Sequence, residues 1–174
     1  MNLNVLTRTL LGAATAALFT IGLAAQGPTK VELKGAKGEA LGTATLTAAG
    51  TGVSIALDVK GLTPGEHAIH LHAAAKCEGP AFTSAGPHFN PDGKKHGMQN
   101  PEGPHAGDMP NFTVAADGTS KAMVMASSVT LGTAANSVFT NGGTALVIHA
   151  GADDMKTDPA GAAGDRIACG VIKK

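Results

Sequence analysis

The sequence contains no tryptophan and no tyrosine, and only 3% of its 174 residues are aromatic. A hydrophobic core must therefore be built mainly from Val, Ile, Leu, Met and Ala. The 13 basic and 13 acidic residues cancel, so no overall charge favours a nucleic acid or an anionic membrane as a partner. After residue 26, no stretch keeps a helical period over three turns, which argues against an α-helical fold.

Turn-forming residues are abundant, with 24 glycines and nine prolines, and they separate short segments of alternating polarity. The alternating segments are residues 30–34, 40–47, 52–59, 67–72, 111–116, 121–126, 145–149 and 166–172. Asp117-Gly118 between two of them is a hairpin signal. The sequence therefore predicts an all-β fold of about eight antiparallel strands, arranged as a sandwich or barrel.

The first 25 residues predict a signal peptide. Residues 9–25 are uncharged and mostly apolar, they follow the cation Arg8, and small residues at Gly22, Ala24 and Ala25 suit a cleavage site. A membrane anchor or a buried helix would need a similar run, but this one is short and no second apolar segment follows. We expect an exported domain over residues 26–174, with no stable membrane insertion after cleavage.

Only two cysteines are present, Cys77 and Cys169, and both lie in the expected mature domain. An even count in an exported chain predicts one disulfide, and two free thiols are the alternative. Bridging the two cysteines would close a loop of more than 90 residues. In the chain-entropy model, closing such a loop stabilises the fold by roughly 4–5 kcal/mol.

Two long segments contain no credible strand, residues 73–110 and residues 150–165. Loops of this length are uncommon in compact domains unless they are functional or cross-linked. The longer loop contains three spaced histidines and Asp108, so metal binding would keep it ordered.

Three histidines lie on or at the end of predicted strands. His70 and His72 are two residues apart and project from one face, and His149 follows the apolar run 145–148. Taken singly, each could be a solvated or hydrogen-bonded structural histidine. Together they offer an all-imidazole set that suits copper, but one further nitrogen is needed for a planar field of four.

A second set of ligands lies in the long loop. His88, His96, His105 and Asp108 follow the spacing H-x7-H-x8-H-x2-D, and three imidazoles with one carboxylate complete a four-coordinate zinc shell. Two four-coordinate metals need eight ligands, whereas seven side chains are available. If His88 loses both ring protons and binds each metal through one nitrogen, both shells are complete.

Four strings make the chain resemble the copper/zinc superoxide dismutases, in particular the exported bacterial type. They are FTSAGPHFNPDGKKHGMQNPEGPHAGDMPN, HAIHLH, VIHAGADD and GDRIACGVI. The resemblance runs from about residue 30 to the C-terminus. It implies an eight-stranded Greek-key sandwich or flattened barrel with two long functional loops, and an antioxidant enzyme that converts superoxide to O2 and hydrogen peroxide.

The resemblance also implies a role for each site residue. The implied copper ligands are His70, His72, His88 and His149, and the implied zinc ligands are His88, His96, His105 and Asp108, with one ion of each metal per subunit. Arg166 matches the arginine beside the copper, Asp153 matches an aspartate that hydrogen-bonds one ligand of each metal, and Cys77 and Cys169 match the family's disulfide. His67 matches a position that does not bind metal.

In the implied mechanism, His88 takes up and returns a proton, and Arg166 docks the superoxide anion. Lys94, Lys95 and Lys156 could add positive potential near the site, or be ordinary surface lysines. The resemblance implies the periplasm as the compartment, and it leaves both a monomer and a homodimer open.

Two other functions use the same ligands. An exported metal-storage or metal-delivery domain would keep the metal sites without needing Arg166 and Asp153 together. A zinc-stapled adhesion domain would leave His70, His72 and His149 unexplained. Neither accounts for the whole set, so the sequence favours the enzyme.

Overall fold

The computed structural model describes residues 27–174, and the predicted signal peptide lies outside this range. Within the described residues, no helix is long and apolar enough to cross a membrane. The strands are β1 (Thr29–Gly35), β2 (Ala40–Ala49), β3 (Gly52–Val59), β4 (Gly65–His67), β5 (Ile69–His72), β6 (Phe112–Val114), β7 (Ser120–Ala126), β8 (Thr144–His149) and β9 (Arg166–Ile172). All strand pairs are antiparallel.

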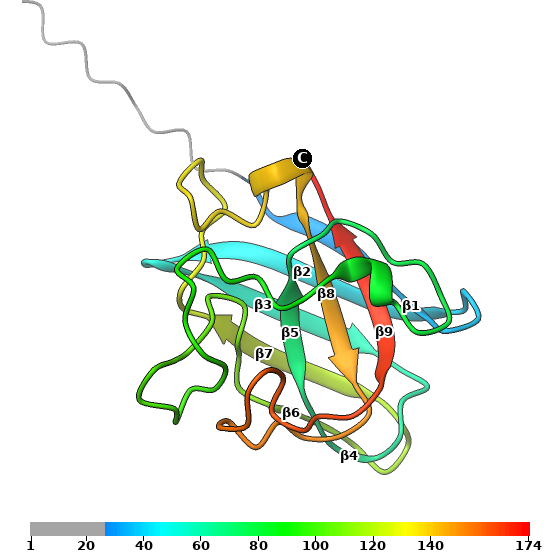
Figure 1. Cartoon of the computed structure of the whole chain (residues 1–174). Coiled ribbons are helices and arrows are strands. Elements are labelled where there is room, and N and C mark those ends of the chain that lie inside the picture. Colours follow the sequence, from blue (N-terminus) through cyan, green and yellow to red (C-terminus); the bar gives the residue numbers. More distant parts are fainter. Residues whose placement is uncertain (1–26) are drawn as a thin grey trace, which may run out of the picture.

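Seven of the strands form one curled sheet in the order β5-β8-β9-β1-β2-β3-β7, and β4 pairs with β6 in a small second sheet. Figure 1 shows β5, β8 and β9 lying across the direction of β2, β3 and β7, so that the sheet wraps around its own core. The predicted all-β antiparallel barrel or sandwich is confirmed.

The core is filled by the aliphatic residues of alternating strand positions. Along β1, Val31 and Leu33 are buried while the residues between them are exposed, and along β3 Val53, Ile55 and Leu57 are buried. Period-two burial is what a strand with one face on the core and one in solvent requires. Phenylalanines also enter the core, at Phe89 and Phe112, so the few aromatic residues are used inside.

Strands β5 and β8 differ from the others because every residue of both is buried. Ile69 and Leu71 of β5 face the main core, so His70 and His72 face the opposite side of the sheet. That side is covered by the long loop between β5 and β6, whose residues Phe89 and Gly107 exchange backbone hydrogen bonds with Leu71. The covering loop turns an outer sheet face into an enclosed site.

Two predicted segments differ from the structure in their pairing. The segment predicted as one strand over 67–72 divides at Ala68, because β4 pairs with β6 whereas β5 pairs with β8. Asp117-Gly118 does form a turn, closed by a bond from Ala115 N to Thr119 O of 2.8 Å. The flanking strands, however, pair mainly with β4 and β3, and not with each other.

The disulfide between Cys77 and Cys169 is present and joins the long loop to β9. It packs with Phe82, Ala85 and Val147 in a small second apolar cluster. The loop is therefore attached to the sheet both covalently and by burial.

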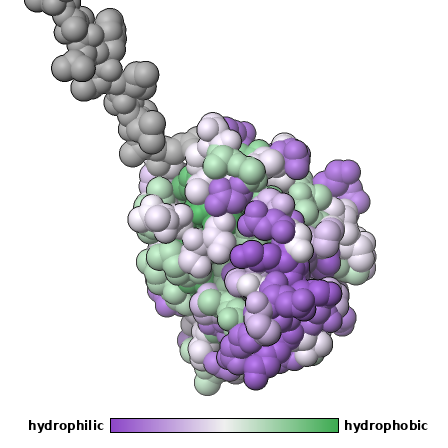
Figure 2. Space-filling view, turned by 60° about the vertical axis from the view of Figure 1, so that its left-hand side comes forward, coloured by the Kyte–Doolittle hydropathy of each residue, from purple (hydrophilic) through white to green (hydrophobic). Residues whose placement is uncertain are grey.

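The face seen in Figure 2 is mixed, with hydrophilic residues gathered in one area and hydrophobic residues in small patches. Among the described residues, the large hydrophobic side chains that are exposed are Met98, Met123, Met125 and Val171. Three of these four are methionines.

Candidate metal centre

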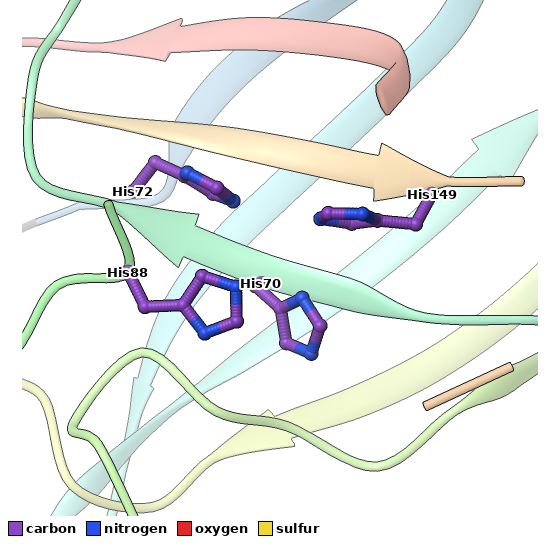
Figure 3. A group of neighbouring side chains, drawn as sticks. All are labelled: His70, His72, His88 and His149. Atoms are coloured by element: carbon purple, nitrogen blue, oxygen red, sulfur yellow. The ribbon is translucent and has the colours of Figure 1, made fainter. Parts of the chain in front are cut away.

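Four histidines from three parts of the chain meet above β5. His70 and His72 come from β5, His149 comes from the end of β8, and His88 comes from the covering loop, where it forms an isolated bridge with His72. All four rings are buried, and Figure 3 shows them turned toward a common space. The sheet brings His149 next to a strand that lies far from it in the sequence, because Ile69 pairs with Ile148.

In three of these rings, the nitrogen that faces away from the common space is hydrogen-bonded to the protein. His70 Nε2 donates to Asp153 Oδ2 at 2.9 Å, His72 Nδ1 donates to Gly86 O at 2.8 Å, and His149 Nδ1 donates to Gly164 O at 3.1 Å. These acceptors hold the ring proton on the outer nitrogen. The inner nitrogen of each ring is thereby left with a free lone pair.

The inner nitrogens have no hydrogen-bond partner. Four buried side-chain atoms of the described residues lack one, and they are His70 Nδ1, His72 Nε2, His88 Nε2 and His149 Nε2. A buried polar atom without a partner is costly, and here the four come one from each ring and converge. The ligand atoms of the four histidines lie within 4.8 Å of one another. Four neutral imidazole nitrogens in this arrangement fit a copper ion.

The loop histidines converge on one oxygen of Asp108. Oδ1 lies 2.9 Å from His88 Nδ1, 3.1 Å from His96 Nδ1 and 3.3 Å from His105 Nδ1. In addition, His105 Nδ1 lies 3.4 Å from His88 Nδ1. Two ligands of a tetrahedral ion with bonds of about 2.0 Å lie about 3.3 Å apart, so these contacts have the lengths of tetrahedral edges. The four residues therefore fit a zinc ion.

The second oxygen of Asp108 is held by the backbone. Oδ2 accepts hydrogen bonds from Gly97 N and from His105 N, both at 2.9 Å. Asp108 also forms an isolated bridge with His70 on β5. The carboxylate is thus fixed by the loop on one side and by the sheet on the other.

His88 belongs to both groups. Its Nε2 is one of the four unpartnered nitrogens above β5, and its Nδ1 faces Asp108 in the loop group. The two groups share only this side chain. One imidazole therefore offers a nitrogen to each metal position.

Asp153 links the two groups from behind. Its Oδ2 accepts from His70 Nε2 at 2.9 Å and from His96 Nε2 at 3.0 Å, so one carboxylate orients a ring in each group. Asn111 holds Asp153 in turn, since Asp153 N donates to Asn111 Oδ1 at 2.9 Å and Asn111 Nδ2 donates to Asp153 O at 3.0 Å. Sequence reasoning missed Asn111, whose signal was a polar residue at the start of the predicted strand 111–116.

Gly161 is a second residue that sequence reasoning missed. Its φ is +65°, and a Cβ placed there would lie 1.8 Å from Asp153 Oδ1 and 2.7 Å from His96 Nε2. Only glycine leaves room for the aspartate that joins the two groups.

The rings of the strand side are neutral in the metal-free protein. Burial, together with the neighbouring charge of His88, lowers the pKa of His72 to about 2. Burial also lowers the pKa of His149 to about 4. The pKa of His88 is lowered to about 4 as well, because the effect of burial exceeds that of the hydrogen bond to Asp108, which raises it. On the loop side, burial opposes protonation of His96, but its hydrogen bonds to Asp108 and Asp153 prevail and raise its pKa to about 9.

Arg166 lies next to the copper-side group. Its Nη1 donates to Phe82 O and its Nη2 donates to Gly86 O, both at 2.8 Å. Gly86 O is also the acceptor for His72 Nδ1, so Arg166 and a strand-side ring share one carbonyl. The guanidinium is held by the disulfide-bonded loop and half exposed to the solvent.

A cavity of about 970 Å³ opens over this group, lined among others by His88, His149 and Arg166. Lys94 and Lys95 also line it, whereas Lys156 is not among its lining residues. The Nζ of Lys95 lies 3.9 Å from Asp158 Oδ2. The cavity therefore gives a small anion a path to His88 and His149 past cationic side chains.

His67 lies outside both groups but supports one of them. It is 1% exposed, and its Nδ1 contacts His149 O at 2.7 Å while its Nε2 contacts Thr63 O at 2.8 Å. The ring thus ties the backbone of His149 to the β3–β4 connection.

Comparison with known proteins agrees with this geometry. The family model "Copper/zinc superoxide dismutase (SODC)" matches residues 40–172. The chain is 50% identical to superoxide dismutase [Cu-Zn] 1 of Aquifex aeolicus (strain VF5), over 92% of this chain and 96% of that one.

Two solved structures share the fold. A SOD-like protein from Bacillus subtilis aligns with a TM-score of 0.79 and 36% identity, over 82% of this chain and 96% of that chain. The Cu/Zn superoxide dismutase from Brucella abortus aligns with a TM-score of 0.68 and 29% identity, over 84% of this chain and 100% of that chain. The chain belongs to the copper/zinc superoxide dismutase family.

Proposed function

We propose that the two groups are the metal sites of this enzyme and that His88 and Arg166 act on the substrate. Copper would be held by His70, His72, His88 and His149, and zinc by His88, His96, His105 and Asp108. The observation that carries the proposal is the position of His88, whose Nε2 faces three unpartnered nitrogens while its Nδ1 faces the zinc-type group.

As a member of its family, the chain is an oxidoreductase whose substrate is superoxide and whose cofactors are copper and zinc. Copper, when bound, supplies the one-electron chemistry that oxidises one superoxide to O2 and reduces the next to peroxide. His88 Nε2 holds a proton in one half of this cycle and gives it to the forming peroxide in the other. The zinc-side contacts of His88 Nδ1 keep the ring in place while Nε2 changes its proton.

Arg166 docks the anion. Its guanidinium is always charged, and two of its N–H groups are used on Phe82 O and Gly86 O. Arg166 lines the same cavity as His88 and His149. This places a fixed positive charge beside the place where superoxide must bind.

We further propose that residues 1–25 are a signal peptide, and that residues 26–174 are the mature domain in the periplasm. The uncharged run 9–25 and the disulfide support export, because disulfides persist in oxidising compartments. N-terminal sequencing of protein from a periplasmic extract should begin near residue 25 or 26. Full-length chain confined to the cytoplasm would contradict export.

The catalytic roles are tested with protein loaded with one copper and one zinc per chain. We expect it to accelerate superoxide decay, and its cupric spectrum to show the signature of an imidazolate shared with zinc. Arg166→Ala should lower the rate and weaken its dependence on ionic strength at unchanged metal content. Arg166→Lys keeps the positive charge that Arg166→Ala removes, but it cannot make the pair of bonds to Phe82 and Gly86. Full metal loading without superoxide decay would instead favour a storage domain.

A further inference from the structure

Two exposed methionines on one strand have no part in the metal centre. Met123 is 69% exposed and Met125 is 44% exposed, although methionine is a residue that proteins usually bury. Both lie on β7, and their spacing of two residues places them on the same outer face of the sheet. The methionines are therefore neighbours on an open surface.

Ser54 of β3 lies next to both methionines. Ser54 is paired directly with Met125, and directly paired residues have Cβ atoms about 4.5–5.5 Å apart. At the same time, Ser54 Oγ donates to Met123 Sδ at 2.7 Å, although Met123 is paired with Ala56. The side chain of Met123 therefore runs along the sheet toward the residue that lies opposite Met125.

The surroundings of this pair contain little that would attract a hard cation. Thr47 lies beyond Ser54 on β2, and Ala56 lies beside Met123. The nearest charged groups along these two strands, Lys121 and Asp58, are paired with each other at 3.3 Å. The two thioethers are the soft ligands of this face, and both cysteines of the described chain are used in the disulfide.

We propose that Met123 and Met125 form a surface site for a soft monovalent ion, Cu(I), with Ser54 Oγ as a neighbouring oxygen. Thioether sulfur selects Cu(I) over the divalent ions of the same row. A sulfur atom has two lone pairs, so Met123 Sδ can accept the Ser54 hydroxyl and still bind an ion. The site is separate from the metal centre, because Ser54, Met123 and Met125 belong to none of the histidine and aspartate groups. Two neutral ligands hold the ion weakly and reversibly.

The test uses the copper- and zinc-loaded protein, so that the histidine sites are filled, and silver nitrate in chloride-free buffer as a redox-inactive probe. The methionine methyl groups are labelled with carbon-13 and followed by NMR. We expect the Met123 and Met125 methyl signals to shift together and to saturate at one silver ion per chain, while the copper content stays constant. Met98 is an internal control, because its 44% exposure equals that of Met125 and it lies on the long loop, where the other methionine, Met109, is buried.

Variants make the outcome decisive. Met123→Leu or Met125→Leu should each weaken silver binding by about tenfold or more, whereas Met98→Leu should leave it unchanged. The proposal is wrong if the Met98 signal shifts at the same silver concentration, because the pair would then bind silver no more tightly than a single exposed methionine does. A second titration adds Cu(I) as a chelate under anaerobic conditions. The proposal is also wrong for copper if the chemical shifts of both methyl signals then stay unchanged.

Discussion

The strand side and the loop side of the metal centre are held by different forces. His70 and His72 lie on β5, which bonds to β8 along one edge and to loop residues along the other, so their positions are set by backbone pairing. His96 and His105 lie in the long loop between β5 and β6, where no strand holds them. Asp153 contacts the ring of His96, but the carboxylate that both rings share is that of Asp108. Backbone pairing thus fixes the strand side, whereas the loop side depends on the carboxylate of Asp108.

The largest effect should follow from removing that carboxylate. Asp108→Asn removes the charge, and because its one oxygen is needed to accept from Gly97 N and His105 N, it turns an NH2 group toward the three rings; zinc affinity should fall by more than the roughly 10–100-fold that loss of an outer partner costs. Hydrogen exchange of the amides of residues 90–106 should become faster, while those of β5 and β8 stay protected. Metal analysis and exchange mass spectrometry measure the two effects. Equal loss of protection in β8 would contradict the comparison.

The disulfide should account for a large share of what holds the loop to the sheet. Replacing Cys77 and Cys169 together by Ser opens a loop whose ends are 92 residues apart, and should lower the free energy of unfolding by roughly 4–5 kcal/mol. Urea denaturation of the zinc-loaded protein, with and without the disulfide, measures this difference. Because Arg166 is bonded to Phe82 O in the same loop, the rate of superoxide decay should fall as well.

Gly161 tests the connection between the two sides. Gly161→Ala would push Asp153 away from His70 and His96 together, so binding of both metals should weaken by about 10–100-fold. Gly50→Ala is the matched control, because Gly50 has a similar φ of +58° with nothing within 4 Å of the added Cβ. Similar metal losses in both variants would show that the backbone angle, and not the contact with Asp153, is responsible.

The pH dependence of metal binding should differ between the two sides. In the metal-free protein, the pKa of His96 is raised to about 9, so this ring is protonated at neutral pH. Zinc must displace that proton, and zinc affinity should therefore rise about tenfold per pH unit up to about pH 9. His72 and His149, with lowered pKa values of about 2 and 4, are already neutral and release no proton to copper at pH 7. Each metal is added alone to the metal-free protein, so that His88 keeps one ring proton, and calorimetry in buffers of different ionisation enthalpy counts the protons that the metal releases. Equal release by the two metals would contradict the difference.

The smallest effect concerns the charge on the rim of the cavity. Lys94 lines the cavity, so Lys94→Gln should lower the rate of superoxide decay by about twofold at low salt and reduce its ionic-strength dependence. Lys94→Arg should keep the rate, and Lys30→Gln on β1, away from the cavity, is the control for a loss of charge elsewhere. An unchanged salt dependence in Lys94→Gln would show that the charge of Lys94 does not attract superoxide toward the cavity.

The strands were predictable because alternation is a local property. The segments predicted over 52–59 and 166–172 match β3 and β9 in both bounds. The division of the predicted strand 67–72 was not predictable, since it arises from pairing with β6 and β8, which are distant in sequence. The same holds for the hairpin at Asp117-Gly118, where the turn is local but the strand partners are not.

The sequence by itself determined the composition of the centre: six histidines and two aspartates at fixed spacings, two cysteines, and an arginine close to one of them. Ligand chemistry depends on residue type, and residue type is written in the sequence. Only the tertiary structure decided which ring nitrogen is left free, how Asn111 and Gly161 keep Asp153 between the two sides, and that Met123 reaches Ser54, the residue paired with Met125. These features depend on contacts between elements far apart in the chain, and such contacts exist only once the sheet has closed.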